Sequence, residues 1–277
     1  MRNYLCASCL KYFLQYYKFT LINFCINPCL PAGRCGKQDY RTEELNMTIV
    51  ITGAGKGIGY TTALLLAAAQ DNTVIAIARK AEALAKLKAE SNSAIQTITF
   101  DLKNYRDISS VLVPEIKKIS KQVDVLINNA GVLIKKNITE LSASDIEESY
   151  SVNVFSHILL IKELIPLMEG RQSHIVNMSS MGGVQGSVKF PGLSAYSSTK
   201  AALINLTEVL AVELKEKNIY VNSVAFGSVQ TEMFGEAFPN VKAGLSVHDA
   251  AKYLADFCLN GRKYFNGKVL QVSTTTP

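Results

Sequence analysis

The sequence lacks several features that would mark whole classes of protein. No block of like charges stands out along the 277 residues, and the net charge is only +6, so nothing indicates a nucleic-acid-binding tract. No stretch reaches about 18 uninterrupted apolar residues, which argues against a membrane-spanning helix. Apolar residues make up 48% of the chain and charged residues 19%. This balance excludes wholesale disorder and is enough for a sizeable core.

Cysteine is scarce in most of the chain, because five of the six cysteines fall within the first 46 residues. A C-x2-C pair and a C-x3-C pair, fifteen residues apart, approximate the ligand spacing of a zinc site: Cys6, Cys9, Cys25 and Cys29. The second pair is one residue longer than usual, and neither pair contains a glycine. We therefore interpret residues 1–46 as an extension outside the folded domain, with Met47 as the functional start, and we expect no metal site.

From Met47 onward, apolar β-branched runs alternate with helical patterns, which is typical of βαβ units and a parallel sheet. Seven runs are predicted as strands: Thr48–Thr52, Thr73–Ala78, Ile95–Phe100, Val123–Asn128, His174–Ser179, Tyr220–Val224 and Lys268–Val272. Helical patterns lie between them, including Gly59–Ala69, Ala81–Glu90 and Ser197–Lys215. Strands this apolar are usually covered on both faces. We predict one doubly wound α/β domain of the Rossmann type over residues 47–277.

A glycine-rich turn follows the first predicted strand and reads Thr52-Gly-Ala-Gly-Lys-Gly-Ile-Gly59. Glycines at this place permit a sharp turn and let a pyrophosphate approach backbone N–H groups at a helix start. The pattern is T-G-x-x-x-G-x-G rather than G-x-G-x-x-G. It is not a P-loop, because Lys56 is followed by Gly57 and not by Ser or Thr. Alone, such a turn is a weak signal of a nucleotide site.

Further polar motifs follow at the ends of later strands. Asp101-Leu102 ends the third strand, Asn128-Asn-Ala-Gly131 the fourth and Ser179-Ser180 the fifth, and Tyr196-x-x-x-Lys200 opens a helix. Open α/β sheets bind ligands at the carboxyl ends of their strands. In this order and with the glycine turn, the motifs resemble those of the short-chain dehydrogenase/reductase family, in its shorter-subunit branch. The resemblance extends from Met47 to about Ser273.

The resemblance implies an oxidoreductase that moves a hydride between a nicotinamide cofactor and a carbonyl or secondary alcohol. It implies Tyr196 as the general acid/base, with Lys200 lowering the pKa of that phenol from about 10 and holding the nicotinamide ribose. Ser180 would hydrogen-bond the substrate oxygen. Ser179 competes with it, but in the family the second serine of the pair is usually catalytic. Asn153 matches the family asparagine that supports a proton relay with the lysine.

Cofactor choice rests on charge. An acidic residue closing the second strand would favour NAD by accepting hydrogen bonds from the adenosine ribose. This strand instead ends in Ala78-Arg79-Lys80, and Lys56 lies in the glycine turn, so three cations favour the 2′-phosphate of NADP over NAD. The predicted cofactor contacts are Gly53, Lys56, Gly57, Ile58, Gly59, Arg79, Lys80, Asp101, Leu102, Asn128, Ala130, Gly131, Tyr196, Lys200, Val229 and Thr231.

The sequence departs from the family pattern near the expected substrate. The interval from Ser180 to Tyr196 is longer than is common, and the extra residues fall in Gln185–Leu193. After the sixth strand, Phe226-Gly227 replaces the usual Pro-Gly. The segment Glu232–Ser246 is short for a substrate lid, so we expect a comparatively open pocket.

The substrate is not disclosed by these motifs. Phe190, Met233 and Phe234 are candidates for an apolar pocket, and a 3-oxoacyl-thioester and a small ketone or pteridine both fit as substrates. The alternative function is an NADP-binding sensor or scaffold without turnover, although Ser180, Tyr196 and Lys200 are all present. We expect a small-molecule partner but no nucleic acid and no membrane. The resemblance implies a cytoplasmic homodimer or homotetramer.

Overall fold

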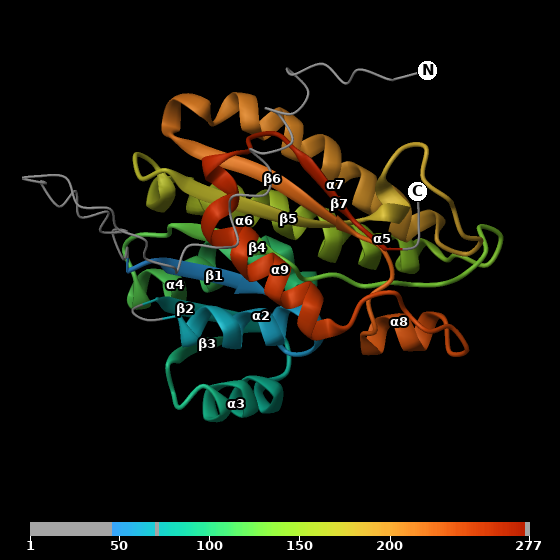
Figure 1. Cartoon of the computed structure of the whole chain (residues 1–277), viewed down its shortest axis with the longest axis horizontal. Coiled ribbons are helices and arrows are strands. Elements are labelled where there is room, and N and C mark those ends of the chain that lie inside the picture. The colour runs from blue at the N-terminus through green and yellow to red at the C-terminus, as the bar shows by residue number, and fades with distance from the viewer. Residues whose placement is uncertain (1–45, 70–71, 275–277) are drawn as a thin grey trace, which may run out of the picture. The chain divides into compact units, whose positions relative to one another are not determined.

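The computed structural model describes residues 46–69 and 72–274, so the predicted extension, including its cysteine pairs, lies outside the described residues except for Asn46. The described chain forms one parallel sheet in the order β3-β2-β1-β4-β5-β6-β7 (Figure 1). Its strands are β1 (Thr48–Thr52), β2 (Thr73–Ala78), β3 (Ile95–Thr99), β4 (Val125–Asn128), β5 (Ser173–Ser180), β6 (Ile219–Phe226) and β7 (Val269–Val272). The chain builds outward from β1 to β3 and then returns to place β4 on the other side of β1. The predicted doubly wound fold is therefore confirmed.

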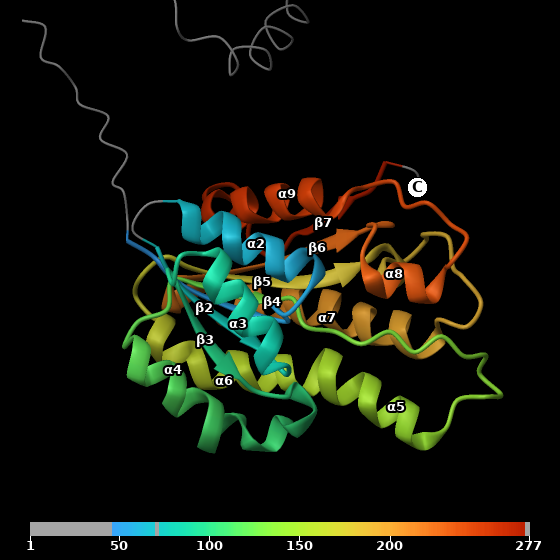
Figure 2. The same ribbon diagram turned by 90° about the horizontal axis from the view of Figure 1, so that it is seen from below.

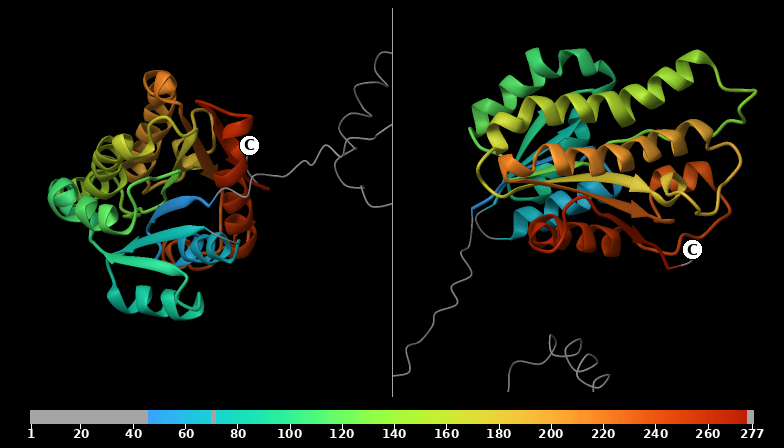
Figure 3. Two further views of the ribbon diagram at one scale, coloured as in Figure 1. Left: turned by 90° about the vertical axis from the view of Figure 1, so that its left-hand side faces the viewer. Right: turned by 90° about the horizontal axis from the view of Figure 1, so that it is seen from above.

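Helices cover both faces of the sheet (Figure 2), and the view at the left of Figure 3 shows the two layers end-on. One layer consists of α2 (Gly57–Ala68), α3 (Ala81–Glu90) and α9 (Val247–Asn260). The other contains α4 (Val113–Ile119), α5 (Ala143–Tyr150), α6 (Ser156–Met168) and α7 (Ser194–Glu213).

Alternate residues along each central strand pack into two separate hydrophobic cores, one on each face of the sheet. Ile49 and Ile51 of β1 pack in the core under α2 and α9, while Val50 packs in the core under α4 and α6. This alternation follows from the two-residue period of a strand. Leu66 of α2 and Leu164 of α6 are fully buried on opposite faces. Burial on both faces explains why the sequence shows nearly continuous apolar runs.

Two helix starts differ from the prediction in a way that matters for the site. The helix after the glycine turn begins at Gly57 rather than Gly59, so the turn leads directly into its first residues. Helix α7 begins at Ser194 rather than Ser197, so Tyr196 lies within its first turn. Tyr196 and Lys200 are four residues apart on this helix and therefore project from one face.

Helices α5 and α6 are joined by a π-helical turn over Ser151–Phe155 into one run, 143–168. By length and composition this is the one helix among the described residues that could cross a membrane, but half of its most apolar window is buried inside the structure. Leu160 and Leu164 from this run are fully buried in the core. We therefore interpret the run as a core helix.

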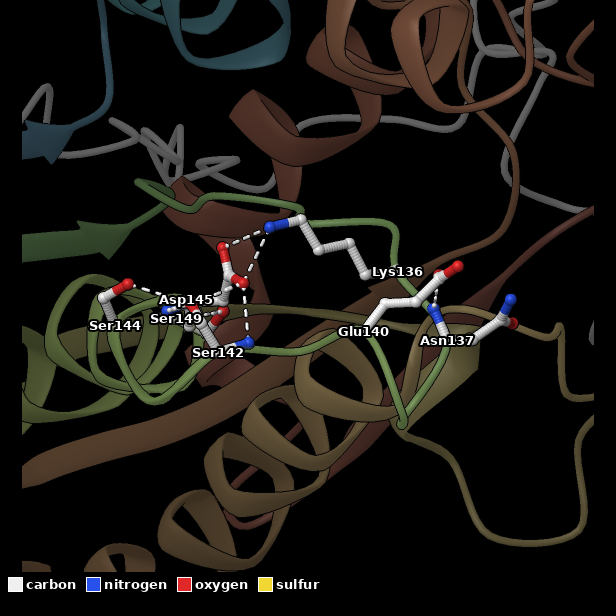
Figure 4. A network of polar contacts seen from close by, with 7 residues as sticks. All are labelled: Lys136, Asn137, Glu140, Ser142, Ser144, Asp145 and Ser149. Atoms are coloured by element: carbon white, nitrogen blue, oxygen red, sulfur yellow. Dashed lines mark hydrogen bonds and ion pairs between the residues drawn. The ribbon is translucent and has the colours of Figure 1, made fainter.

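The segment after β4 is pinned to the start of α5 (Figure 4). Ser142 Oγ accepts a hydrogen bond from the Asp145 N–H at 3.2 Å, and the Asp145 carboxylate accepts one from the Ser142 N–H at 2.9 Å, which makes a capping box. Lys136 Nζ lies 2.7 Å from Asp145 Oδ2. These hydrogen bonds, with Lys136 first, lower the pKa of Asp145 to about 2. The Lys136 N–H also donates to the Gly192 carbonyl at 3.0 Å, which links this segment to the loop before α7.

Candidate active site

A cavity of about 1020 Å³ lies at the carboxyl ends of the strands. The glycine turn, the end of β2, the N-N-A-G motif and the Tyr196/Lys200 pair all contribute lining residues. Every residue predicted from the sequence to be catalytic or to contact the cofactor lines this cavity, except Asn128 and Asn153. The topology therefore gathers motifs separated by up to 178 positions, from Gly53 to Thr231, around one space.

Two glycines in the turn are fixed by geometry. Gly53 has φ +69°, which favours glycine. A Cβ on Gly59 would lie 2.3 Å from Asn129 Nδ2 and 2.6 Å from the Gly53 carbonyl oxygen, so no side chain fits. Asn129 Nδ2 in turn donates to the carbonyl oxygens of Thr52 and Gly53, at 3.0 and 3.2 Å. The ends of β1 and β4 are thereby held against the start of α2.

Asn129 is a lining residue that the sequence analysis missed. Thr52 Oγ1 accepts from the backbone N–H groups of both Asn129 and Ala130, each at 3.1 Å. The sequence signal for Asn129 was its position as the second asparagine of the N-N-A-G motif. Asn128, in contrast, is fully buried beneath the cavity and donates to Asn177 Oδ1 at 2.9 Å. Asn129 rather than Asn128 lines the cavity, because side chains alternate between faces at the end of a strand, and the contact of Asn128 with the cofactor stays a prediction.

The start of α2 presents free backbone donors to the cavity. Its N-cap, Lys56, makes no side-chain capping hydrogen bond, and the first turn contains no acidic residue. Unsatisfied N–H groups at a helix start, together with the helix dipole, favour an anionic group there. A phosphate fits this end of the cavity on both counts.

The three predicted cations all line the cavity. Arg79 and Lys80 follow β2, are exposed, and make no ion pair within the described residues. Lys56 Nζ lies 3.9 Å from Glu236 Oε1 on α8 (Glu232–Ala237). Lys56 is therefore shared with a carboxylate, whereas Arg79 and Lys80 are available to an anionic ligand. The Asp101 carboxylate at the end of β3 accepts from the Lys103 N–H at 3.0 Å.

The two serines at the end of β5 have different partners. Ser179 Oγ is buried and donates to the Lys200 carbonyl at 2.8 Å, so its hydrogen is already used. Ser180 Oγ accepts from the Gly182 N–H at 3.1 Å and hydrogen-bonds with Tyr196, so its hydroxyl faces the phenol. Of the two serine hydroxyls, the Ser180 hydroxyl is therefore the one positioned to hydrogen-bond a substrate oxygen that also contacts the Tyr196 hydroxyl.

Lys200 is 4% exposed, and its Nζ donates to the Met178 carbonyl at 2.8 Å and lies 5.7 Å from the Tyr196 ring centroid. Burial lowers the pKa of Lys200 to about 8. Burial of the Tyr196 hydroxyl raises its pKa, and the hydrogen bond with Ser180 opposes that rise. In the protein without cofactor, burial is therefore the largest influence on the Tyr196 pKa, and the lowering of this pKa by Lys200 stays a prediction.

Asn153 lies behind the cavity and not in its lining. Its Oδ1 accepts from the Val132 N–H at 2.8 Å, and its Nδ2 donates to the Val132 carbonyl and Thr199 Oγ1, each at 3.0 Å. A Cβ on Gly131 would lie 3.4 Å from both Asn153 Oδ1 and Lys200 Nζ. The side chain therefore fixes the backbone next to Lys200.

The replacement of Pro-Gly by Phe226-Gly227 does not disturb the end of β6. Phe226 is buried at the end of β6, and the Gly227 N–H donates to the Val272 carbonyl at 2.9 Å, so the strand simply continues to this point. Phe190, Met233 and Phe234 line the cavity, as do Phe238 and Val241, which the sequence analysis missed. The missed residues follow α8 in a stretch without a recognisable motif.

Known proteins share both the sequence pattern and this architecture. A family model described as short chain dehydrogenase matches residues 47–242. The ketoacyl reductase HetN of Nostoc sp. is 35% identical over 67% of this chain, and the match spans 65% of that protein. The 3-oxoacyl-[acyl-carrier-protein] reductase FabG of Aquifex aeolicus is 30% identical over 81% of this chain and 94% of its own.

A solved structure of a short chain dehydrogenase from Burkholderia cenocepacia, in complex with NADP, superposes with a TM-score of 0.74. It is 26% identical, and the match covers 82% of this chain and 96% of that one. The family model matches more than half of the chain, and the matched region contains the glycine turn, the N-N-A-G motif and the Tyr196/Lys200 pair. The chain therefore belongs to the short-chain dehydrogenase/reductase family of NAD(P)-dependent oxidoreductases.

Proposed function

We propose that this protein uses NADP to interconvert a carbonyl compound and a secondary alcohol. The observation that carries the proposal is the group formed by Tyr196, Ser180 and Lys200 at one part of the cavity. The same cavity contains a helix start without a side-chain cap and two cations that make no ion pair with any described residue. Such an arrangement suits a ligand with phosphates at one end and a reacting carbon at the other.

The residues around the glycine turn are suited to the phosphates of the dinucleotide. The N–H groups at the start of α2 would meet the pyrophosphate, and Arg79 and Lys80 would meet a 2′-phosphate. Lys200 is within reach of the space in front of Gly131 and would hold the nicotinamide ribose. The bound nicotinamide supplies the hydride in reduction and accepts it in oxidation.

Proton transfer falls to Tyr196. In reduction, the carbonyl carbon gains a hydride and the oxygen gains the phenol proton, so that C=O becomes CH–OH. Ser180 donates a hydrogen bond to the same oxygen as negative charge develops on it. The raised pKa keeps the phenol protonated near neutrality, which favours its role as the acid in reduction. Oxidation of an alcohol needs the phenolate, so its rate should rise with pH.

Replacing Tyr196 with Phe tests the reaction. The variant keeps the ring but removes the proton donor, so turnover of a carbonyl panel with NADPH should fall at least 100-fold, the lower end for general acid catalysis. The affinity for NADPH, read from nicotinamide fluorescence, should change little. Tyr264→Phe is the matched control, because Tyr264 is 75% exposed and does not line the cavity. Unchanged turnover in Tyr196→Phe would refute the role, and NADPH binding without turnover in the native protein would favour a sensor.

Cofactor choice is tested by removing the two free cations. The Arg79→Ala, Lys80→Ala double variant should raise the KM for NADPH about tenfold or more, because a charge-assisted hydrogen bond contributes about 1.5–3 kcal/mol. The KM for NADH should stay within about twofold, since NADH lacks the 2′-phosphate. A native preference for NADH, or an equal loss for both cofactors, would overturn the choice of NADP.

A homo-oligomer in the cytoplasm remains part of the proposal. Large exposed apolar side chains occur on the α5–α6 run and on α7, namely Ile146, Phe155, Ile158, Val209 and Val212. Val212 is the most exposed of these side chains, at 77%, and such side chains are candidates for burial between subunits. Light scattering coupled to size exclusion should give a mass of two or four chains, and a monomer would refute it.

A further inference from the structure

Apolar side chains gather at one part of the cavity mouth. Val188, Phe190 and Val241 all line the cavity, and they are 49%, 50% and 52% exposed. They come from two separate segments: the longer loop before α7, and the residues after α8. Three large apolar side chains left half exposed around one opening mark a surface that an apolar ligand would cover.

Aromatic contacts join these two segments. The Phe190 and Phe238 rings meet edge to face, with centroids 6.0 Å apart, and Phe234 lies 5.2 Å from Phe238. Lys135 Nζ sits 4.2 Å from the Phe238 ring centroid and donates to the Ala237 carbonyl at 2.7 Å. The Phe238 ring therefore contacts Lys135, Phe190 and Phe234, which hold it at the mouth of the cavity. Aromatic rings therefore frame the mouth of the cavity.

The cations near this mouth are mostly committed to the protein. Lys135 binds the Ala237 carbonyl, and Lys189 Nζ donates to the carbonyls of Gly182 and Val184 and lies 2.8 Å from Ser187 Oγ. Among the described residues at this end, Lys242 lines the cavity without such a partner. A single exposed lysine does not form the converging donor set that selects a carboxylate. The chemistry of the mouth therefore suits an apolar substituent better than an acidic one.

We propose that Phe190, Phe238, Val188 and Val241 form the specificity site for a carbonyl substrate that carries an apolar ring beyond its reacting carbon. This inference rests on the proposed function for the reaction, but the site also has a binding activity that can be measured without turnover. The ring would lie against Phe190 and Phe238 while the carbonyl oxygen meets Tyr196 and Ser180.

Three matched ketones test the site: 2-butanone, 4-phenyl-2-butanone and 4-oxopentanoate. They share one methyl ketone and differ by hydrogen, phenyl or carboxylate on the same carbon. With NADPH, kcat/KM for the phenyl ketone should exceed that for 2-butanone by at least tenfold, which is within the range that an apolar pocket provides. The carboxylate should give no gain. The same order should appear in binding to protein saturated with oxidised NADP, where no ketone can react.

Phe190→Ala and Phe238→Ala should each reduce the ratio of the phenyl ketone to 2-butanone about tenfold, both in kcat/KM and in binding affinity. Phe190→Leu should keep part of the preference, and melting curves check that each variant is folded. Tyr264→Ala is the control, since this exposed ring lies outside the cavity lining. Equal binding of the phenyl ketone and 2-butanone, a preference unchanged in both alanine variants, or a preference for 4-oxopentanoate would overturn the inference. A binding preference without any turnover would support this site and overturn the proposed reaction.

Discussion

Replacing Lys200 with Met should make the protein without cofactor more stable, although Lys200 is central to the proposed chemistry. Burial lowers the pKa of Lys200 from its ordinary 10.5 to about 8. Each pKa unit corresponds to about 1.4 kcal/mol, so the charged lysine destabilises the folded protein by about 3 kcal/mol near neutral pH. Met fills a similar volume without a charge, but it loses the hydrogen bond from Nζ to the Met178 carbonyl, which contributes about 1 kcal/mol.

The expected net gain is therefore about 2 kcal/mol at pH 7. For a chain of this size, that gain corresponds to a rise in Tm of about 4–8 °C. Urea unfolding followed by circular dichroism, at one fixed protein concentration, measures it directly. The concentration is fixed because assembly would also shift the apparent stability.

The pH dependence gives the sharper test. Below pH 8, Lys200 is charged in both the folded and the unfolded protein, so its burial destabilises the folded protein by the full amount. Between pH 8 and 10.5 the unfolded chain binds a proton that the folded chain does not, so the stability of the native protein rises relative to the variant. The advantage of Lys200→Met should therefore shrink by about 3 kcal/mol across this window. A variant that is less stable at pH 7, with a difference independent of pH, would refute the reasoning.

Two other predictions follow from the same structure. Gly59→Ala should destabilise the fold by about 1–3 kcal/mol and abolish NADPH binding, because its Cβ would lie 2.3 Å from Asn129 Nδ2. Gly235→Ala, whose Cβ meets nothing within 4 Å, is the matched control and should cost nothing in melting temperature or fluorescence titration. Burial lowers the pKa of His174 to about 4, so the native protein should lose about 3 kcal/mol more than His174→Gln as the pH falls from about 6.5 to 4. Urea midpoints at several pH values measure this difference, and parallel curves would contradict it.

The proposed site was largely predictable because its residues occur in ordered motifs next to strand ends. The glycine turn, the serine pair and the Tyr196/Lys200 spacing each have a local chemical reason, and parallel strands place their carboxyl ends together. The motif spacing did not predict which side chain of Asn128 and Asn129 lines the cavity. Which of two adjacent amides faces the cavity depends on where β4 ends, and element boundaries are the least certain part of a sequence pattern.

The direction of a pKa shift can be predicted from the sequence only where one interaction dominates it. Proximity of an ammonium predicts a lowered phenol pKa for Tyr196, yet burial raises it in the structure. Desolvation depends on the whole surrounding volume, which a spacing of four residues does not describe. The unequal use of Ser179 and Ser180 likewise depends on α7 packing against β5.

The sequence by itself determined the seven parallel strands, the two helical layers and the family, because hydrophobic periodicity and glycine placement are local properties of the chain. The tertiary structure alone decided which side chains surround the opening of the cavity. Phe190 and Phe238 are 48 positions apart and belong to no motif, yet their rings meet at 6.0 Å. Lys135 and Lys189 similarly look like free surface charges in the sequence, and only folding gives them backbone carbonyls as partners. Contacts between distant loops depend on the path of each loop through space, and neither composition nor spacing records that path.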